Sequence, residues 1–240
     1  MMEQIELSMR LQAVADMVTP GNRVCDVGCD HGFVSIYLVE QQISNHVIAM
    51  DVRSGPLERA IQHVKEQQLE EYITCRLSDG ITALNAGEAD TMICAGMGGR
   101  LMIHILEKEK EKTDSFQELI LQPQSEPEKV RRYVRENGFI IVEESMVYEE
   151  GKYYPMFRAV HNQGQMQEAT QIEDRYGALL LQEKNPVLLA FLEYERQMYH
   201  TILEELMSSK EPTQRQLQRM NEVRDELQRN EHIRSKYYAL

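Results

Sequence analysis

The stretch Val24-Cys-Asp-Val-Gly-Cys-Asp-His-Gly32 decides the fold of the first part of this chain. A β-rich run leads into a turn containing Gly28, Asp30 and Gly32 and then directly into a helical pattern. Glycines in such a turn let a ligand approach the backbone. The spacing departs from the dinucleotide fingerprint GxGxxG, and Asp30 would repel a pyrophosphate at the helix N-terminus. The turn therefore favours a ligand with a cationic group, such as S-adenosylmethionine with its ammonium and sulfonium, over NAD or FAD.

Acidic residues also follow the next two predicted strands. Asp51, with Val52 after it, ends the second strand, and the third is followed by Ser78, Asp79 and Gly80. Ligands of parallel sheets bind beyond the carboxyl ends of the strands, so we expect Gly28, Asp51 and Asp79 to converge there. Asp51 is placed to accept both ribose hydroxyls of an adenosine. Each acid alone could be a helix cap or turn former, but that interpretation predicts no regular placement.

The fourth predicted strand runs into a glycine-rich segment, Cys94-Ala-Gly-Met-Gly-Gly-Arg100. Its glycines leave the backbone uncovered, as expected where a flat base slides against the chain. A flexible hinge or a helix start is the alternative. A phosphate-binding loop is disfavoured because no Lys-Ser/Thr pair follows.

Short β-rich runs alternate with helical patterns between residues 23 and 160, which indicates βαβ units on a doubly wound, mostly parallel sheet. Strands are predicted at residues 23–27, 46–51, 72–76, 91–95, 118–122 and 139–146, with a candidate seventh at 154–160. Helices are predicted at residues 33–42, 56–68, 100–108 and 127–137. The fold class is therefore α/β and Rossmann-like.

The organisation changes near residue 165. The polar segment 162–170 is predicted to be a linker, which gives domains at residues 1–163 and 164–240. Heptad spacing then relates Leu188, Leu192, Glu195, Tyr199, Ile202 and Leu206. After a break at 208–212, one helix face carries Leu217, Met220, Val223 and Leu227. Two long helices predict an α-helical coiled-coil hairpin, which is either a cap or dimerisation element or a partner-binding arm.

Composition bounds the class of protein. The 240 residues are 42% apolar and 27% charged, which excludes collagen-like, low-complexity and wholly disordered chains. No apolar run reaches the roughly 18–20 residues that span a bilayer, and no signal peptide is evident, so we expect a soluble, cytoplasmic chain without a membrane partner. The four cysteines lack CxxC spacing, which favours free thiols, and no cluster supports a metal site. A net charge of −13 argues against indiscriminate nucleic-acid binding, so any RNA must meet local arginines.

The chain resembles the bacterial tRNA (adenine(22)-N(1))-methyltransferase family (TrmK-like), which are class I S-adenosylmethionine-dependent enzymes. The resemblance covers most of residues 1–160 and rests on the motifs Ser8–Ala15, Asp26–Gly32, Ala95–Gly99, Leu119–Gln124 and Glu149–Tyr154. The helical tail matches that family's C-terminal coiled-coil domain in kind. The resemblance implies S-adenosylmethionine as cofactor, tRNA as partner and methyl transfer to N1 of adenine 22; the position comes from the resemblance alone.

The implied chemistry needs orientation more than acid–base catalysis, because neutral adenine already carries a lone pair on N1. Enzymes of this class that methylate exocyclic amines commonly carry an Asn/Asp-Pro-Pro-aromatic motif where this chain has residues 96–99, and its absence favours a ring nitrogen over N6. Methylation at N1 leaves a cationic base, and Asp30 is the predicted catalytic carboxylate that stabilises it. Asp30 could equally cap the helix or bind the methionine ammonium, and His31 could contact either ligand or be structural.

The predicted site combines two sets of residues. The cofactor set is Asp26, Gly28, Asp30, His31, Gly32, Asp51, Val52, Ser78, Asp79, Gly80, Gly96 and Met97. The tRNA set is Arg10, Gly98, Gly99 and Arg100, whose arginines would hold phosphates while the base is unstacked. Two further groups are predicted to be solvated helix surface rather than RNA contacts: Arg131, Arg132 and Arg135, and Arg215 with Arg219.

Two other functions are compatible with the sequence. One is a nicotinamide-dependent oxidoreductase or epimerase, which Asp30 and the loop spacing disfavour. The other is a non-catalytic adapter that uses the helical hairpin as a binding arm. The oligomeric state is left open, with a monomer slightly favoured.

Overall fold

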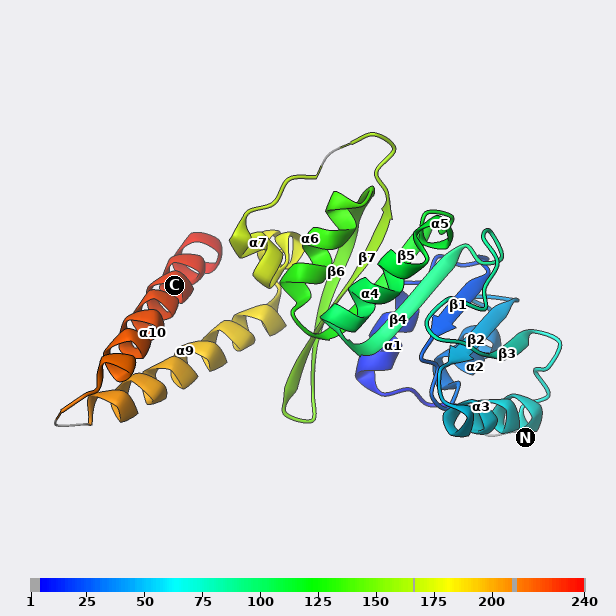
Figure 1. Cartoon of the computed structure of the whole chain (residues 1–240), viewed down its shortest axis with the longest axis horizontal. Helices are drawn as coiled ribbons and strands as arrows, with labels where there is room; N and C mark the ends of the chain where they lie inside the picture. The colour runs from blue at the N-terminus through cyan, green and yellow to red at the C-terminus, as the bar shows by residue number, and fades with distance from the viewer. Residues whose placement is uncertain (1–4, 166, 209–210, 240) are drawn as a thin grey trace. The chain divides into compact units, whose positions relative to one another are not determined.

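A computed structural model describes residues 5–165, 167–208 and 211–239 of the chain. Within them one seven-stranded sheet has the order β3-β2-β1-β4-β5-β7-β6 (Figure 1). The first five strands run parallel, and β6 and β7 form an antiparallel hairpin that pairs with β5. The predicted doubly wound, mostly parallel sheet is confirmed, with the candidate seventh strand. The strands are β1 (Val24–Val27), β2 (Val47–Asp51), β3 (Ile73–Leu77), β4 (Thr91–Gly98), β5 (Glu118–Ser125), β6 (Phe139–Glu149) and β7 (Lys152–His161).

Helices cover both faces of the sheet, which explains why every residue of β1 and β2 is buried. One face carries α1, α2 and α3, whose apolar residues join the main core cluster. The other carries α4 and α6, which lie side by side in Figure 1. The helices are α1 (Met9–Asp16), α2 (Phe33–Glu40), α3 (Ser54–Glu66), α4 (Gly99–Lys108), α5 (Lys110–Thr113) and α6 (Pro127–Glu136).

The fourth strand is longer than predicted. The sequence places its end at residue 95, whereas β4 continues to Gly98 because the glycine-rich segment still pairs with β5. The ladder shifts register at Gly96, whose φ of +78° lies in the left-handed region that glycine adopts without strain. This bulge bends the strand end at the carboxyl edge of the sheet.

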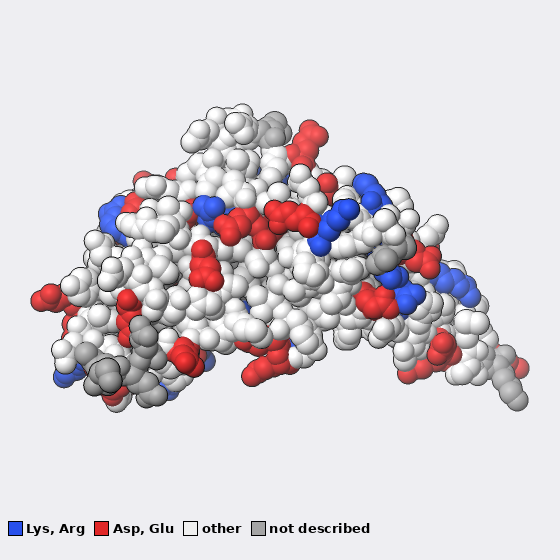
Figure 2. Space-filling model, turned by 180° about the vertical axis from the view of Figure 1, so that it is seen from behind, with Lys and Arg blue, Asp and Glu red and all other residues white. Residues whose placement is uncertain are grey.

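Charge is distributed without a large basic surface on the face seen in Figure 2. Acidic side chains are spread over that face, and basic side chains stand singly or in small groups among them. This pattern agrees with a net charge of −13. On this face, attraction to a polyanion would depend on local arginines rather than on the average field.

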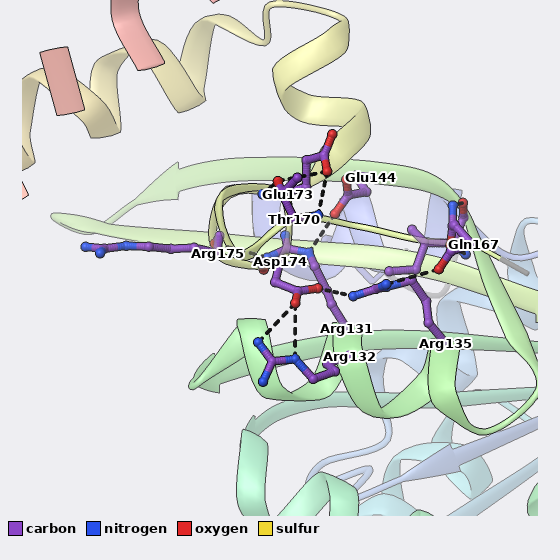
Figure 3. Close-up of polar contacts among 10 residues, drawn as sticks. Arg131, Arg132, Arg135, Glu144, Gln167, Thr170, Glu173, Asp174 and Arg175 are labelled. Atoms are coloured by element: carbon purple, nitrogen blue, oxygen red, sulfur yellow. Dashed lines mark hydrogen bonds and ion pairs between the residues drawn. The ribbon is translucent and has the colours of Figure 1, made fainter. Parts of the chain in front are cut away.

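Arg131 and Arg135 of α6 are not solvated helix surface, so that prediction is wrong for both; Arg132 is exposed, as predicted, but is paired (Figure 3). Arg131 is buried, and its Nε donates to Glu144 Oε1 at 2.7 Å. Arg132 and Arg135 both form ion pairs with the buried carboxylate of Asp174, which belongs to α7 (Gln171–Tyr176). The sequence pattern could not reveal this, because the partners lie on other elements. The cluster attaches α7 to the sheet domain.

The boundary between the two compact units follows from this attachment. The units are Met1–Gly177 and Ala178–Leu240, so the predicted boundary at 163/164 falls inside the first. The segment predicted to be a linker is pinned, because the side-chain amide of Gln167 bonds both backbone groups of Ile141 at 2.8 and 3.0 Å. That contact occupies the free edge of β6, and a capping box of Thr170 and Glu173 then begins α7.

The second unit contains α8 (Ala178–Gln182), α9 (Pro186–Met207), α10 (Gln214–Ile233) and the π-helical turn η1 (Arg234–Tyr238). The two long helices pack against each other, and the predicted seam residues Leu188, Leu192, Glu195 and Tyr199 are buried. Residues 209 and 210 of the predicted break lie outside the described residues. Arg215 and Arg219 are exposed, as predicted. None of the described helices combines the length and apolar character needed to cross a membrane.

Candidate active site

A cavity of about 430 Å³ opens beyond the carboxyl ends of the central strands. All of the predicted cofactor residues except Gly32 line it, and so does Arg10 of the predicted tRNA set. Gly98, Gly99 and Arg100 do not line it. The lining residues come from α1, the start of α2, α4, the strands β1, β2, β4 and β5, and the turns after β1, β2 and β3. The topology therefore assembles the site at the sheet edge where parallel α/β folds bind their ligands.

The turn after β1 is held in an unusual backbone conformation. Gly28, Asp30 and Gly32 all have φ between +50° and +76°, and Asp30 adopts this left-handed geometry as a non-glycine residue. A Cβ at Gly28 would lie 2.3 Å from the tip of the flexible Met97 side chain, which could move, so the preference for glycine rests on its φ of +75°. At Gly32 a Cβ would lie 3.1 Å from Ala60 Cβ, so that glycine instead serves the packing of α2 on α3.

Asp51 ties two turns of the site together. Its side chain is 4% exposed, and it accepts hydrogen bonds from the backbone N–H groups of Arg53 at 2.9 Å and Asp30 at 3.2 Å. Each carboxylate oxygen takes one of these bonds and keeps a lone pair for a ligand. The end of β2 therefore presents a fixed, buried acceptor to the cavity.

Asp26 is the most unusual titratable group of the cavity. Its carboxylate is buried and accepts a hydrogen bond from Ser35 Oγ at 2.7 Å. No lysine or arginine in the described part of the chain forms an ion pair with it. Burial is the largest cause and raises the pKa of Asp26 to about 6, although the Ser35 hydrogen bond lowers it in part; the nearby Asp51 charge adds a smaller rise. A cationic ligand group would relieve the cost of this buried charge.

The turn after β3 is more exposed. Asp79 forms an ion pair with Lys108 at 2.6 Å, which holds the pKa of its carboxyl below the ordinary value. Ser78 Oγ donates to Gly80 O and accepts from Ala83 N, so Ser78 shapes the turn. The acid at this strand end lies in the cavity wall but has a partner within the protein.

Asp30 and His31 of the turn after β1 both line the cavity. The Asp30 side chain is 58% exposed and lies 3.8 Å from His31 Nε2. The ring of His31 stacks on Phe33 with centroids 5.5 Å apart, and His63 stacks on both. Phe33 also lines the cavity, which the sequence analysis did not predict. These rings form a stacked aromatic surface beside the exposed carboxylate of Asp30.

Gly98 and Gly99 pack closely against the end of β5 and do not form an open surface. A Cβ at Gly99 would lie 2.5 Å from the backbone oxygen of Ser125, and one at Gly98 would lie 3.3 Å from Ser125 Oγ. Arg100 is exposed and forms an ion pair with Glu126 at 2.9 Å. It therefore stands outside the cavity, on the protein surface after β4.

Among the described residues, the cavity contains neither a metal-binding cluster nor a reactive thiol. No group of three or more His, Cys, Asp or Glu side chains is arranged to hold a metal ion in that part of the chain. All four cysteines are free thiols, and burial raises the pKa of Cys94 to about 12, so it is not a ready nucleophile. The site instead offers buried acids and a stacked aromatic surface. It suits a ligand with cationic groups and a planar base.

Comparison with known proteins identifies the family. Residues 7–157 match the family described as "Methyltransferase domain". The chain is 30% identical over 238 residues to the tRNA (adenine(22)-N(1))-methyltransferase of Bacillus subtilis, covering 95% of this chain and 96% of that protein. This chain belongs to the tRNA (adenine(22)-N(1))-methyltransferase family.

Solved structures of this family share the whole architecture. The crystal structure of the B. subtilis tRNA methyltransferase TrmK matches with a TM-score of 0.81 and 30% identity, covering 96% of this chain and 99% of that one. A Streptococcus pneumoniae protein, a candidate for the same tRNA methylation crystallised in complex with S-adenosyl-L-methionine, matches with a TM-score of 0.83 and 30% identity over 95% and 99% of the two chains.

Besides Phe33, the sequence analysis also missed Gln122, Gln124 and Tyr154 at the site of this family member. Gln124 lines the cavity, and Gln122 accepts a hydrogen bond from Arg10 Nη1 at 2.8 Å. The Arg10 guanidinium also lies 5.3 Å from the centre of the Tyr154 ring. Gln122-Pro-Gln124 lies near the end of β5, so the rule that ligands bind beyond the carboxyl ends of strands already pointed to this edge.

Proposed function

We propose that this protein transfers the methyl group of S-adenosylmethionine to N1 of adenine 22 in tRNA, in the cytoplasm. The observation that carries the proposal is similarity along nearly the whole chain to the B. subtilis enzyme of that name. The acids at the ends of β1, β2 and β3, which gather in one cavity, support it.

The cavity fits this cofactor on its own chemistry. Asp26 is buried without a basic partner from the described residues, and a cationic ligand group would offset that charge. Asp51 would hold the ribose hydroxyls, and the apolar Val52 and Ile105 would contact the adenine ring. When bound, S-adenosylmethionine supplies an electrophilic methyl group on a sulfonium.

The residues of the chain would act mainly by orienting the target base. N1 of neutral adenine carries a free lone pair, so no side chain needs to remove a proton before the reaction. Methylation leaves a positive charge on the base, and the exposed carboxylate of Asp30 is placed in the cavity wall to stabilise it. We assign Arg100 to the tRNA backbone, because its guanidinium is exposed and Glu126 is its partner at the surface.

Replacing Asp51 with alanine is expected to weaken S-adenosylmethionine binding by about 1.5–3 kcal/mol, or roughly tenfold to 150-fold, because hydrogen bonds to a charged acceptor are lost. Titration calorimetry measures the dissociation constant. Asp79→Ala is the matched control at the next strand end, and it should have a smaller effect because Asp79 is exposed and already paired with Lys108. Unchanged affinity in Asp51→Ala would remove Asp51 from the cofactor site.

Replacing Asp30 with asparagine separates charge from shape. Asparagine also tolerates a positive φ, so the turn should keep its backbone. We expect turnover at saturating cofactor to fall on the order of tenfold, or about 1.4 kcal/mol, a modest effect because the carboxylate is half exposed. Steady-state kinetics and calorimetry on the same variant measure both quantities. A loss of cofactor affinity with normal turnover would assign Asp30 to cofactor binding.

The proposed function is tested with purified protein, S-adenosylmethionine and unmodified tRNA transcripts. Mass-spectrometric mapping of nucleosides should find N1-methyladenosine at position 22 and none in a transcript with guanine at that position. Methylation of another base or another position would contradict the proposal. The absence of methyl transfer to any tRNA, with intact cofactor binding, would contradict it as well.

A further inference from the structure

One part of the cavity wall is built from amides and an arginine rather than from acids. It comprises Arg10 of α1, Gly96 at the bulge of β4, and Gln122 and Gln124 of β5. Gly96 also belongs to the predicted cofactor set, but the side chains of Arg10, Gln122 and Gln124 have no role in the cofactor site described above. Their arrangement bears on the second ligand of the proposed reaction, the adenine of the tRNA.

A buried amide fixes the position of this wall. Gln122 is fully buried, and its Oε1 accepts hydrogen bonds from Arg10 Nη1 at 2.8 Å and from the backbone N–H of Gly96 at 3.1 Å. The Arg10 guanidinium is also held 5.3 Å from the centre of the Tyr154 ring. One amide therefore joins α1, β4 and β5, and Arg10 is braced inside the cavity instead of reaching toward a distant phosphate.

Gln124 lies two residues further along the same strand, and its side chain has no such restraint. It is exposed and lines the cavity, and its amide forms no hydrogen bond with another described residue. Its Nε2 is 3.7 Å from the point that a Cβ at Gly96 would occupy. Arg10 Nη1 is 3.5 Å from the same point. Arg10 and Gln124 therefore both border the side of Gly96 that carries no side chain, in the wall of the cavity.

The chemistry of the reaction restricts how adenine can be recognised. N1 must stay free because it accepts the methyl group, so a side chain that pairs with N1 would block the reaction. The other polar edge of adenine carries the N6 amine as donor and N7 as acceptor, and a glutamine amide matches that pair with two hydrogen bonds. Such a contact leaves the N1 lone pair exposed.

We propose that Gln124 is the specificity-determining residue that selects adenine, its Oε1 accepting from N6 and its Nε2 donating to N7. The inference rests on the proposed function and adds the base-reading group to it. Guanine presents O6 and N7, both acceptors, and therefore cannot satisfy the Gln124 carbonyl. Gln122 acts as a positioning residue, because it fixes Arg10 and the bulge at Gly96.

The test combines a substitution in the protein with a substitution in the RNA. Methylation rates are measured for the full-length wild-type protein and Gln124→Ala on tRNA with adenine or 7-deazaadenine at position 22. Loss of the N7 acceptor should lower kcat/KM of the wild type about 5-fold to 100-fold, the usual range for a base contact of this kind. Gln124→Ala should lose a similar or larger factor on adenine, and it should lose nothing further on 7-deazaadenine.

Two controls separate base recognition from damage to the fold or the cofactor site. Gln62→Ala changes an exposed glutamine of α3 that bonds only Glu66 of the same helix, and it should keep wild-type kinetics on both substrates. The affinity for S-adenosylmethionine should be unchanged in Gln124→Ala. Gln124→Glu retains the acceptor for N6 but lacks the donor for N7, so it too should be indifferent to 7-deazaadenine.

Three outcomes would overturn the inference while leaving the proposed function intact. In the first, Gln124→Ala has an unchanged kcat/KM on tRNA with adenine at position 22. In the second, Gln124→Ala still loses the wild-type factor when adenine is replaced by 7-deazaadenine. In the third, the wild type methylates both substrates equally well. A wild-type protein that binds cofactor but methylates no tRNA would instead overturn the proposed function.

Discussion

Replacing Arg131 with methionine should lower the free energy of unfolding by about 3–5 kcal/mol, the cost of removing one member of a buried ion pair. Arg131 and Glu144 are both almost fully buried, and they are joined at 2.7 Å. The guanidinium also donates to the backbone oxygens of Asp174 and Arg175, which end α7. Denaturant unfolding of the full chain followed by circular dichroism measures the change.

The neighbouring arginine provides the matched control. Arg132 is half exposed and pairs with Asp174 at 3.1 Å, so Arg132→Met should cost no more than about 1 kcal/mol, as for a surface ion pair. A second methionine at Glu144 should recover part of the loss, since apolar pairs can replace buried ion pairs. Recovery should be incomplete because the carbonyls of α7 still lose their donor. Equal losses in Arg131→Met and Arg132→Met would contradict this account of the cluster.

Replacing Asp26 with asparagine should change stability and cofactor affinity in opposite directions. The pKa of Asp26 rises from 3.8 to about 6 in the folded protein, mainly through burial. At pH 7.5 the folded protein therefore bears the cost of a buried charge, about 2–3 kcal/mol, which asparagine removes while still accepting from Ser35. The cofactor-free variant should be more stable than the wild type, and it should bind S-adenosylmethionine at least about tenfold more weakly.

The difference in stability between the wild type and Asp26→Asn should depend on pH. Well below pH 3.8 Asp26 is protonated in both the folded and the unfolded protein, so the charge contributes no difference in stability between wild type and Asp26→Asn. The unfolded carboxyl ionises first as the pH rises, so the wild type loses stability relative to the variant between pH 4 and about 6. Denaturant titrations at pH 4, 5, 6 and 7.5 measure the difference. A difference that does not change with pH would show that Asp26 does not carry the shifted pKa.

Much of the site follows from local sequence features. The turn at Gly28, Asp30 and Gly32 is set by residues adjacent in sequence, and the parallel alternation brings the ends of β1, β2 and β3 to one edge. Asp26, Asp51 and Asp79 were therefore predictable as neighbours in one cavity. Gln124 was within reach of the same rule, but a polar residue after an apolar strand gives no signal of its own.

Other features depend on which distant elements meet. Arg10 has the appearance of a free surface base in sequence, whereas Gln122, 112 residues away, draws it into the cavity. Gly98 and Gly99 have the pattern of an open loop, yet Gly99 is required by the backbone at Ser125. The segment 162–170 has the composition of a linker, yet Gln167 holds it on the edge of β6.

The sequence by itself determined the elements, the parallel sheet and the acidic turns, because strand and helix periodicity and the conformational freedom of glycine act over a few residues. Only the tertiary structure decided the roles of the arginines. A guanidinium binds whichever carboxylate or amide the fold brings within reach, and local periodicity carries no information about residues on other elements. Burial then decided the titration of Asp26, since the same carboxyl on the surface would keep its ordinary pKa.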